Sequence, residues 1–282
     1  MSPWVALLSA LALLLSPWLL MPRRRAGEIR GLVLKVLWGL NASYCAFWHR
    51  LEVANRPTLP DEGPAILVSN HTCCIDHMLL QASTRRLLGF LIAKELYEYW
   101  FFRPFCRVGG CIPVRRDGND VAAMRAALRV LGQGRVVPIF PEGQILPTSG
   151  RDVGEAKPGV AFIALRAGVP VIPVYICGTP ATNKVVRSYL TPSRARVYFG
   201  PPIDLSDLTE GGKAERDAFP EVTRRLMSAI RALRDQSTGS EGGASGRASG
   251  SDASRVGVLP DAKRSERDPG RLPVGREAVG PA

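Results

Sequence analysis

Between Pro64 and Gly200 the chain alternates short runs rich in Val and Ile with segments of helical periodicity. Runs of this kind are typical of strands buried on both faces, and a helix between successive strands predicts parallel pairing. We therefore expect an α/β domain whose central sheet is mostly parallel and covered by helices on both faces. The expected strands are Ala65–Ser69, Gly89–Ile92, Cys111–Val114, Val136–Phe140, Val171–Ile176 and Arg196–Phe199. The expected helices are His77–Gln81, Glu95–Phe102, Asp120–Leu131, Gly159–Arg166 and Phe219–Arg234.

An uncharged apolar run, Trp4 to Met21, lies near the N-terminus and is followed at once by Arg23, Arg24 and Arg25. Crossing a bilayer takes roughly 17–25 apolar residues, so this run is at the short end. A signal peptide carries its positive charge before the apolar run, whereas here the charge comes after it. We expect a retained membrane anchor with the body on the cytoplasmic side, where arginines are preferred. A cleaved signal and a core helix are the alternatives.

A second apolar pattern runs from Gly31 to Leu51 and contains Lys35. The charge in its middle favours an interfacial helix over a second span. Four of the five tryptophans lie within the first 48 residues, and the amphipathic ring of tryptophan favours the headgroup layer. Residues 1–52 are therefore predicted to form a membrane anchor and an interfacial helix. The alternative is a helical hairpin buried against the body.

The composition changes at about Asp235. From there to Ala282 the chain consists mainly of Gly, Ser, Arg, Asp and Pro, with few large apolar residues. Such a segment cannot bury enough surface to offset the entropy lost on ordering. We expect a folded domain at residues 53–234 and a disordered tail at residues 235–282.

The formal net charge is +12 and the predicted tail is neutral, so the basic excess lies in the first 234 residues. A basic surface suits anionic lipid headgroups or phosphorylated substrates. No zinc-finger spacing or basic–aromatic run supports nucleic acid as a partner. The six cysteines show no CxxC spacing and two of them, Cys73 and Cys74, are adjacent. We expect free thiols, with neither a disulfide framework nor a zinc ribbon.

A polar segment follows the first expected strand directly, where parallel sheets commonly carry their sites. It contains His71 and Asp76, the residue types of a general base and of the carboxylate that orients it. Residues five apart on a regular helix point about 140° away from each other. The two side chains therefore meet only if a turn intervenes and Asp76 lies near the start of the next helix. Alone, the spacing also fits a structural histidine, or a metal site that includes the neighbouring cysteines and His77.

Three further segments favour catalysis. They are Gly110–Arg116, Phe140–Gly143 and Val169–Val174. With Asn70, His71 and Asp76, which match NHxxxxD, they follow the order and approximate spacing of four motifs of the glycerophospholipid acyltransferases. The chain resembles this family, the lysophosphatidic acid acyltransferases in particular, over most of residues 50–205.

The resemblance implies roles for single residues. His71, oriented by Asp76, takes the proton from an acceptor hydroxyl as that hydroxyl attacks a thioester. Arg116, which takes the place of the family arginine at the end of the second motif, pairs with the acceptor's phosphate. Glu142 of the third motif accepts a hydrogen bond from a glycerol hydroxyl. The adjacent Gly143 lets backbone amides approach a phosphate. The substrate-binding residues expected on this basis are Asn70, Arg115, Arg116, Glu142 and Gly143.

The third motif departs from the family. Many members continue it as FPEGTRS, whereas this chain continues with Gln144, Ile145 and Leu146. We expect either a different acceptor or a phosphate bound by Lys157 instead. The cysteines beside His71 raise a cysteine-nucleophile mechanism, but the resemblance implies attack by the acceptor itself. No GxSxG elbow suggests an acyl-serine.

The function implied by the resemblance is that of a membrane-bound O-acyltransferase of phospholipid synthesis. It moves a fatty acyl group from acyl-CoA or an acyl carrier protein to the free hydroxyl of 1-acyl-glycerol 3-phosphate, without a metal or redox cofactor. We expect it at the cytoplasmic face of a membrane, the inner membrane of a bacterium. The alternatives are another acceptor (glycerol 3-phosphate, a lyso-aminolipid or a lysophospholipid), a hydrolase, and a non-catalytic lipid-binding protein.

Overall fold

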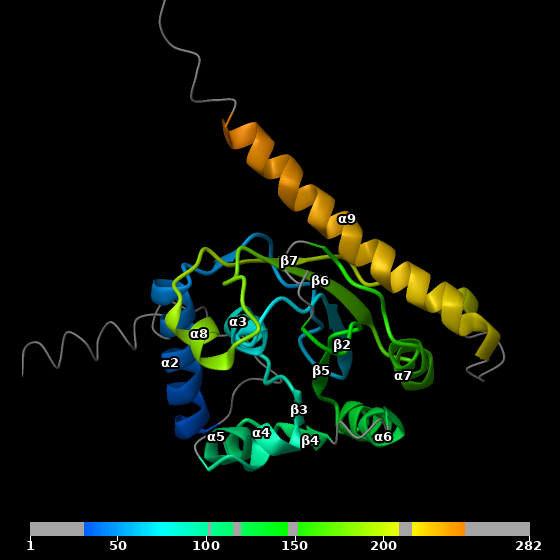
Figure 1. Ribbon diagram of the computed structural model, residues 1–282. Helices are drawn as coiled ribbons and strands as arrows, with labels where there is room; N and C mark the ends of the chain where they lie inside the picture. The colour runs from blue at the N-terminus through cyan, green and yellow to red at the C-terminus, as the bar shows by residue number, and fades with distance from the viewer. Residues whose placement is uncertain (1–30, 101–102, 115–119, 146–151, 209–215, 246–282) are drawn as a thin grey trace, which may run out of the picture. The chain divides into compact units, whose positions relative to one another are not determined.

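A five-stranded sheet forms the centre of the computed structural model, which describes residues 31–100, 103–114, 120–145, 152–208 and 216–245 (Figure 1). The strand order is β1-β7-β6-β2-β5. Strand β2 is parallel to both of its neighbours, β1 is parallel to β7, and only β6 and β7 pair antiparallel. The mostly parallel sheet expected from the sequence is thus confirmed. Its strands are β1 (Glu52–Val53), β2 (Ala65–Ser69), β5 (Val136–Ile139), β6 (Val171–Cys177) and β7 (Arg196–Phe199).

Strand β2 is fully buried because both of its faces pack against apolar layers. Ile66 and Val68 belong to one core, and Ala65 and Leu67 to the other, as the alternation of side chains along a strand requires. The first core is completed by helices α6 (Asp120–Leu131), α7 (Gly159–Ala167) and α9 (Phe219–Ser245). The second is completed mainly by α2 (Leu32–Trp48) and α3 (Asp76–Ala82). Helices therefore cover both faces, as expected (Figure 1).

Two predicted strands do not join this sheet. Strands β3 (Leu91–Ala93) and β4 (Ile112–Val114) pair with each other in a separate two-stranded parallel sheet. Just before β3, the chain bonds to the edge of β5 through the Leu88–Val136 bridge and the Gly89 amide, which donates to the Val136 carbonyl. An apolar run identifies a strand but not its neighbour, and the sequence also gave no sign of the short strand β1.

Two helix boundaries were predicted wrongly. The single helix expected at Glu95–Phe102 is instead α4 (Lys94–Glu98) followed by α5 (Arg103–Val108). Pro104 favours the first turn of a helix, which explains why a new one begins there. The first residues of the tail expected from Asp235 are helical, because α9 continues to Ser245. In this extension the Ser237 hydroxyl is buried and donates to the Arg234 carbonyl.

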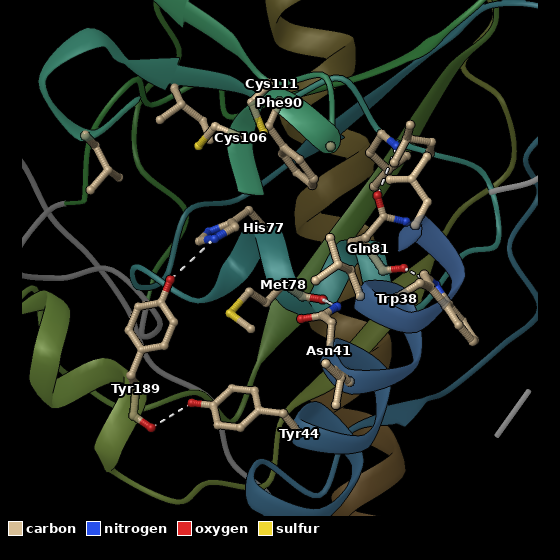
Figure 2. Close-up of a pocket in the computed structure, with 18 residues that line it drawn as sticks. Trp38, Asn41, Tyr44, His77, Met78, Gln81, Phe90, Cys106, Cys111 and Tyr189 are labelled. Carbon is tan, nitrogen blue, oxygen red and sulfur yellow. Dashed lines mark hydrogen bonds between the residues drawn. The ribbon is translucent and has the colours of Figure 1, made fainter. Parts of the chain in front are cut away.

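Helix α2 packs along α3 through polar contacts. Trp38 Nε1 donates to the Gln81 carbonyl and Asn41 Nδ2 donates to the Met78 carbonyl, at 3.1 and 3.0 Å (Figure 2). Trp38 Nε1 also lies 3.1 Å from the Thr84 carbonyl. Apolar side chains on its outer side remain exposed, namely Leu32, Val33, Val36, Leu40, Phe47 and Trp48. Helix α2 thus packs on the body of the protein, as the alternative of a buried helical hairpin requires. It also presents an apolar face to solvent.

Within the described residues, no helix combines the length and the apolar character needed to cross a membrane. The run from Trp4 to Met21, which the sequence predicts to be an anchor, lies outside those residues.

Gly178, which follows β6, allows a test of the sheet's packing. Its φ is 70°, and a Cβ there would lie 2.0 Å from the Arg194 carbonyl oxygen. Gly168, which ends α7, has φ 58° but no atom within 4 Å of an added Cβ. We expect Gly168→Ala to cost about 1–2 kcal/mol from left-handed strain alone, and Gly178→Ala at least about 3 kcal/mol because backbone must also move. Thermal unfolding followed by circular dichroism measures both. Equal losses of stability in the two variants would show that the close approach of Gly178 to the Arg194 carbonyl does not affect stability.

Candidate active site

The site begins where β2 ends. At that point the Asn70 side chain turns to the neighbouring strand β6, where its Nδ2 donates to the Ile176 carbonyl at 2.9 Å and its Oδ1 accepts from the Ile176 amide at 2.8 Å. Asn70 is buried. Both ends of its amide are thus bonded to the backbone, so Asn70 fixes the end of β2. The substrate-binding role expected from the sequence stays a prediction.

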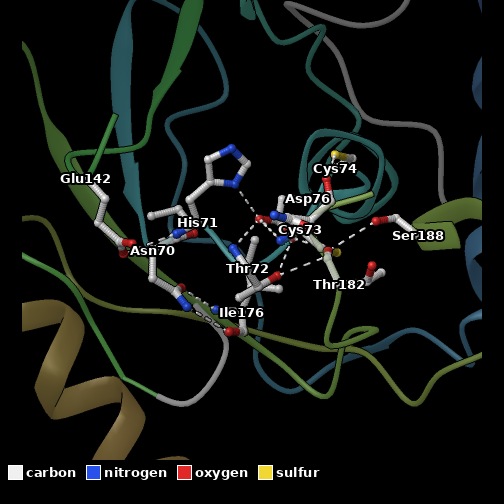
Figure 3. A network of polar contacts seen from close by, with 12 residues as sticks. Asn70, His71, Thr72, Cys73, Cys74, Asp76, Glu142, Ile176, Thr182 and Ser188 are labelled. Atoms are coloured by element: carbon white, nitrogen blue, oxygen red, sulfur yellow. Dashed lines mark hydrogen bonds and ion pairs between the residues drawn. The ribbon is translucent and has the colours of Figure 1, made fainter. Parts of the chain in front are cut away.

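Asp76 organises the turn between β2 and α3. Its Oδ2 accepts from the amides of Thr72 and Cys73 at 2.5 and 3.0 Å, and its Oδ1 accepts from the Thr72 hydroxyl (Figure 3). Asp76 is fully buried and is the first residue of α3. A short acidic side chain that accepts nearby backbone amides stabilises such a turn.

His71 and Asp76 meet across this turn, as predicted. Nδ1 of His71 lies 2.7 Å from Asp76 Oδ2. The His71 ring stacks on Phe140, with ring centroids 4.2 Å apart and planes 16° apart. Its second nitrogen points away from the polar cluster (Figure 3), and 17% of the side chain is exposed. Because the carboxylate accepts at Nδ1, Nε2 is left as the proton acceptor.

Glu142 lies on the other side of His71. Its Oε1 accepts from the His71 amide at 3.3 Å, and its Oε2 has no hydrogen-bond partner among the described residues. Burial raises the pKa of the Glu142 carboxyl, against the opposing effect of the His71 amide. Such a buried, half-satisfied carboxyl can accept from or donate to a substrate hydroxyl.

Gly143 and Lys157 lie beside Glu142. Gly143 has φ 69°, and a Cβ added to it would come within 2.8 Å of Lys157 Cε. The Lys157 amide donates to the Pro141 carbonyl at 2.9 Å, and the residue is exposed. The structure therefore brings the third motif and Lys157 together, and the phosphate contact expected of Lys157 stays a prediction.

Arg115 and Arg116 lie outside the described residues, so the expected arginine contact with a phosphate stays a prediction.

The cysteines of the site are free thiols. Burial raises the pKa of Cys73 to about 12, and the Asp76 carboxylate adds to this effect. A thiol is nucleophilic as its thiolate, so Cys73 is poorly suited to form an acyl-enzyme. In the part of the chain that the structure describes, no three His, Cys, Asp or Glu side chains are grouped to hold a metal ion.

An apolar cavity of about 450 Å³ adjoins the site (Figure 2). Its walls come from α2, α3, the β3–β4 region and α8 (Val185–Leu190). His77 faces the cavity, and burial lowers its pKa to about 4 despite the opposing charge of Asp76. His77 directly follows Asp76 in α3, so this part of the cavity wall lies near the His71–Asp76 pair.

Sequence reasoning missed this cavity. Residues that line it include Leu37, Tyr44, His77, Met78, Phe90, Cys106 and Tyr189. They come from elements far apart in the chain. The only local signal was the apolar side of the segment Gly31–Leu51, which was interpreted as a membrane-facing helix.

Comparison with known proteins places the chain in a family. Residues 50–177 match the family model described as Acyltransferase. The 1-acyl-sn-glycerol-3-phosphate acyltransferase of Streptococcus pneumoniae is 28% identical over 211 residues, which cover 74% of this chain and 72% of that protein. The 1-acyl-sn-glycerol-3-phosphate acyltransferase beta of Homo sapiens is 27% identical over 185 residues, 63% of each chain.

A solved structure agrees with this assignment at the level of the fold. The crystal structure of the 1-acyl-sn-glycerophosphate acyltransferase PlsC from Thermotoga maritima matches with a TM-score of 0.52 and 22% identity, over 80% of this chain and 93% of that one. The segment matched by the family model contains His71, Asp76 and Glu142. Residues 50–177 thus form an acyltransferase domain, and the chain is an O-acyltransferase like these named relatives.

Proposed function

We propose that this protein transfers a fatty acyl group from acyl-CoA or an acyl carrier protein to the free hydroxyl of 1-acyl-glycerol 3-phosphate. The observation that carries the proposal is the 2.7 Å contact between His71 and the buried Asp76. It leaves one imidazole nitrogen to accept a hydroxyl proton. The names of the relatives from Streptococcus pneumoniae and Homo sapiens support this choice of acceptor.

The reaction is a direct transfer. His71 Nε2 takes the proton of the acceptor hydroxyl while the hydroxyl oxygen attacks the thioester carbonyl carbon. As the carbon–sulfur bond breaks, the thiolate leaves and takes the same proton from the imidazolium. Asp76 stabilises the imidazolium in between and keeps the ring in the required tautomer. The products are the acylated acceptor and a free thiol, and His71 returns to its neutral state.

The cavity suits an acyl chain. Its volume of about 450 Å³ lies within the range of ~300–1,000 Å³ usual for small-molecule pockets. Each methylene transferred from water to such a wall stabilises the complex by ~0.8 kcal/mol. The titratable groups in the wall remain uncharged at neutral pH, since burial lowers the pKa of His77 and raises that of Tyr44 to about 12.

The acceptor headgroup is assigned to the third motif. Lys157 passes over Gly143 next to Glu142, where its ammonium can pair with a phosphate. Glu142 Oε2, which lacks a partner among the described residues, would hydrogen-bond a glycerol hydroxyl. In this chain Lys157 replaces the arginine of the FPEGTRS sequence.

We place the protein at the cytoplasmic face of a membrane, the inner membrane of a bacterium. The support is the apolar run Trp4–Met21, the three arginines that follow it and the exposed apolar residues of α2.

The His71–Asp76 pair gives the first test. We expect His71→Ala to reduce acyl transfer by ~10²–10⁴-fold. Asp76→Asn should cause a loss of similar size, because an amide no longer stabilises the imidazolium. The measurement is transfer of labelled acyl-CoA or acyl carrier protein donor to lysophosphatidic acid in vesicles. Binding of lysophosphatidic acid should persist in His71→Ala, and circular dichroism should confirm folding. Full activity in that variant would remove His71 from the mechanism. Lipid binding without any transfer by the wild type would instead favour the binding-protein alternative.

The cysteine-nucleophile alternative needs its own test. Cys73→Ser and Cys74→Ser should each keep acyl transfer within about threefold, because no acyl-thioester intermediate forms on the protein. Rapid-quench measurement with labelled donor should reveal no protein-bound acyl group in the wild type. Loss of activity with retained folding in either variant, together with a labelled wild type, would establish covalent catalysis.

Lys157 can be tested with two acceptors. We expect Lys157→Ala to raise the KM for lysophosphatidic acid about tenfold or more, since a charge-assisted hydrogen bond contributes ~1.5–3 kcal/mol, and to change kcat little. Lys157→Arg should restore most of this loss. Monoacylglycerol, which has no phosphate, should react equally slowly with wild type and variant. An equal loss with both acceptors would mean that Lys157 supports the loop and does not bind phosphate.

A further inference from the structure

Helix α8 (Val185–Leu190) presents two large apolar side chains to solvent. Val186 is 70% exposed and Leu190 is 68% exposed. Residues four apart share one face of a helix, so the two side chains lie side by side. The opposite face packs on the body, because Ser188 is buried, and the Tyr189 carbonyl accepts from the Tyr44 hydroxyl of α2.

Basic residues surround these apolar side chains. Lys184, Arg187 and Arg194 are all exposed. In the sequence, no Asp or Glu occurs between Glu155 and Asp204. Apolar side chains flanked by cations are the pattern that binds the boundary between anionic headgroups and hydrocarbon.

Helix α8 adjoins α2 and the cavity. The Tyr189 carbonyl accepts from the Tyr44 hydroxyl at 2.6 Å, and both residues line the cavity (Figure 2). Just beyond α8, the Ser193 amide donates to the Trp48 carbonyl at 3.4 Å. Trp48 is 43% exposed, and its ring type favours the headgroup layer. The α8 surface is defined as Phe47, Trp48, Lys184, Val186, Arg187, Leu190 and Arg194.

We propose that the α8 surface docks onto a bilayer containing anionic phospholipid, with Val186 and Leu190 inserted below the headgroups. The proposal rests on the proposed function, since it identifies where lipid substrates approach the cavity. An acidic protein is a poorer fit, because a specific protein interface needs ~800 Å² of shaped surface on each partner. A six-residue helix with apolar tips can insert into a bilayer without such complementarity.

The first experiment measures vesicle binding of the full chain without substrate. Vesicles of phosphatidylcholine with phosphatidylglycerol are compared with pure phosphatidylcholine by co-sedimentation. We expect Val186→Asp combined with Leu190→Asp to weaken binding to the anionic vesicles at least about tenfold. Val121→Asp is the matched control, because Val121 is 44% exposed on α6, and it should bind as the wild type does. Arg187→Gln combined with Arg194→Gln should remove most of the preference for anionic vesicles.

A second measurement detects insertion of α8 even if residues 1–30 also bind lipid. Trp is introduced as Val186→Trp or, as control, Val121→Trp, and the added fluorescence is measured in vesicles containing brominated phospholipid. Quenching at position 186 but not at 121 supports the proposal; equal quenching at both positions overturns it. A Val186→Asp, Leu190→Asp variant that binds vesicles normally but loses rate only with acyl carrier protein donors also overturns it, in favour of protein docking. Co-sedimentation and quenching do not depend on turnover, so failure of the proposed function remains a separate result.

Discussion

The buried carboxylate of Asp76 is the interaction on which the site depends. A buried charge is costly unless its hydrogen-bonding capacity is used. Here the amides of Thr72 and Cys73, the Thr72 hydroxyl and the His71 ring use it. These same contacts close the turn after β2 and fix the orientation of the imidazole. The same contacts therefore serve two purposes. They offset the cost of burying Asp76, and they set the tautomer of His71 that the proposed mechanism needs.

Burial then distinguishes the other reactive groups from His71. His77 is next to Asp76 in the chain, yet desolvation lowers its pKa to about 4 and keeps it neutral. Desolvation raises the pKa of Cys73 to about 12. His71 differs because its ring is partly exposed and stacked on Phe140. Of these three neighbours, His71 alone combines access to solvent with a carboxylate partner, which is what a reversible proton acceptor requires.

The sequence predicted what depends on local pattern. Strands β2 and β7 and helix α6 have the expected bounds, and the turn that brings His71 to Asp76 followed from helix geometry. It did not predict the separation of β3 and β4 from the main sheet, because apolar runs do not encode strand neighbours. The structural role of Asn70 was not predicted either, since its two bonds go to Ile176, more than a hundred residues away. The cavity could not be predicted because its walls come from distant segments.

The position of the cavity has a physical consequence for lipid substrates. Moving an acyl chain from a bilayer into water costs ~0.8 kcal/mol per methylene, more than ~10 kcal/mol for a chain of about sixteen carbons. An enzyme that took its acceptor from water would depend on the very small dissolved fraction. Tyr44 and Tyr189 belong to the cavity wall, and the exposed apolar residues of α2 and α8 adjoin them. In the docking that we propose, an acyl chain would pass from one apolar environment to another and avoid most of this cost. A polar glycerol phosphate would remain at the headgroup layer, the depth at which Trp48 and the basic residues of the α8 surface favour contact.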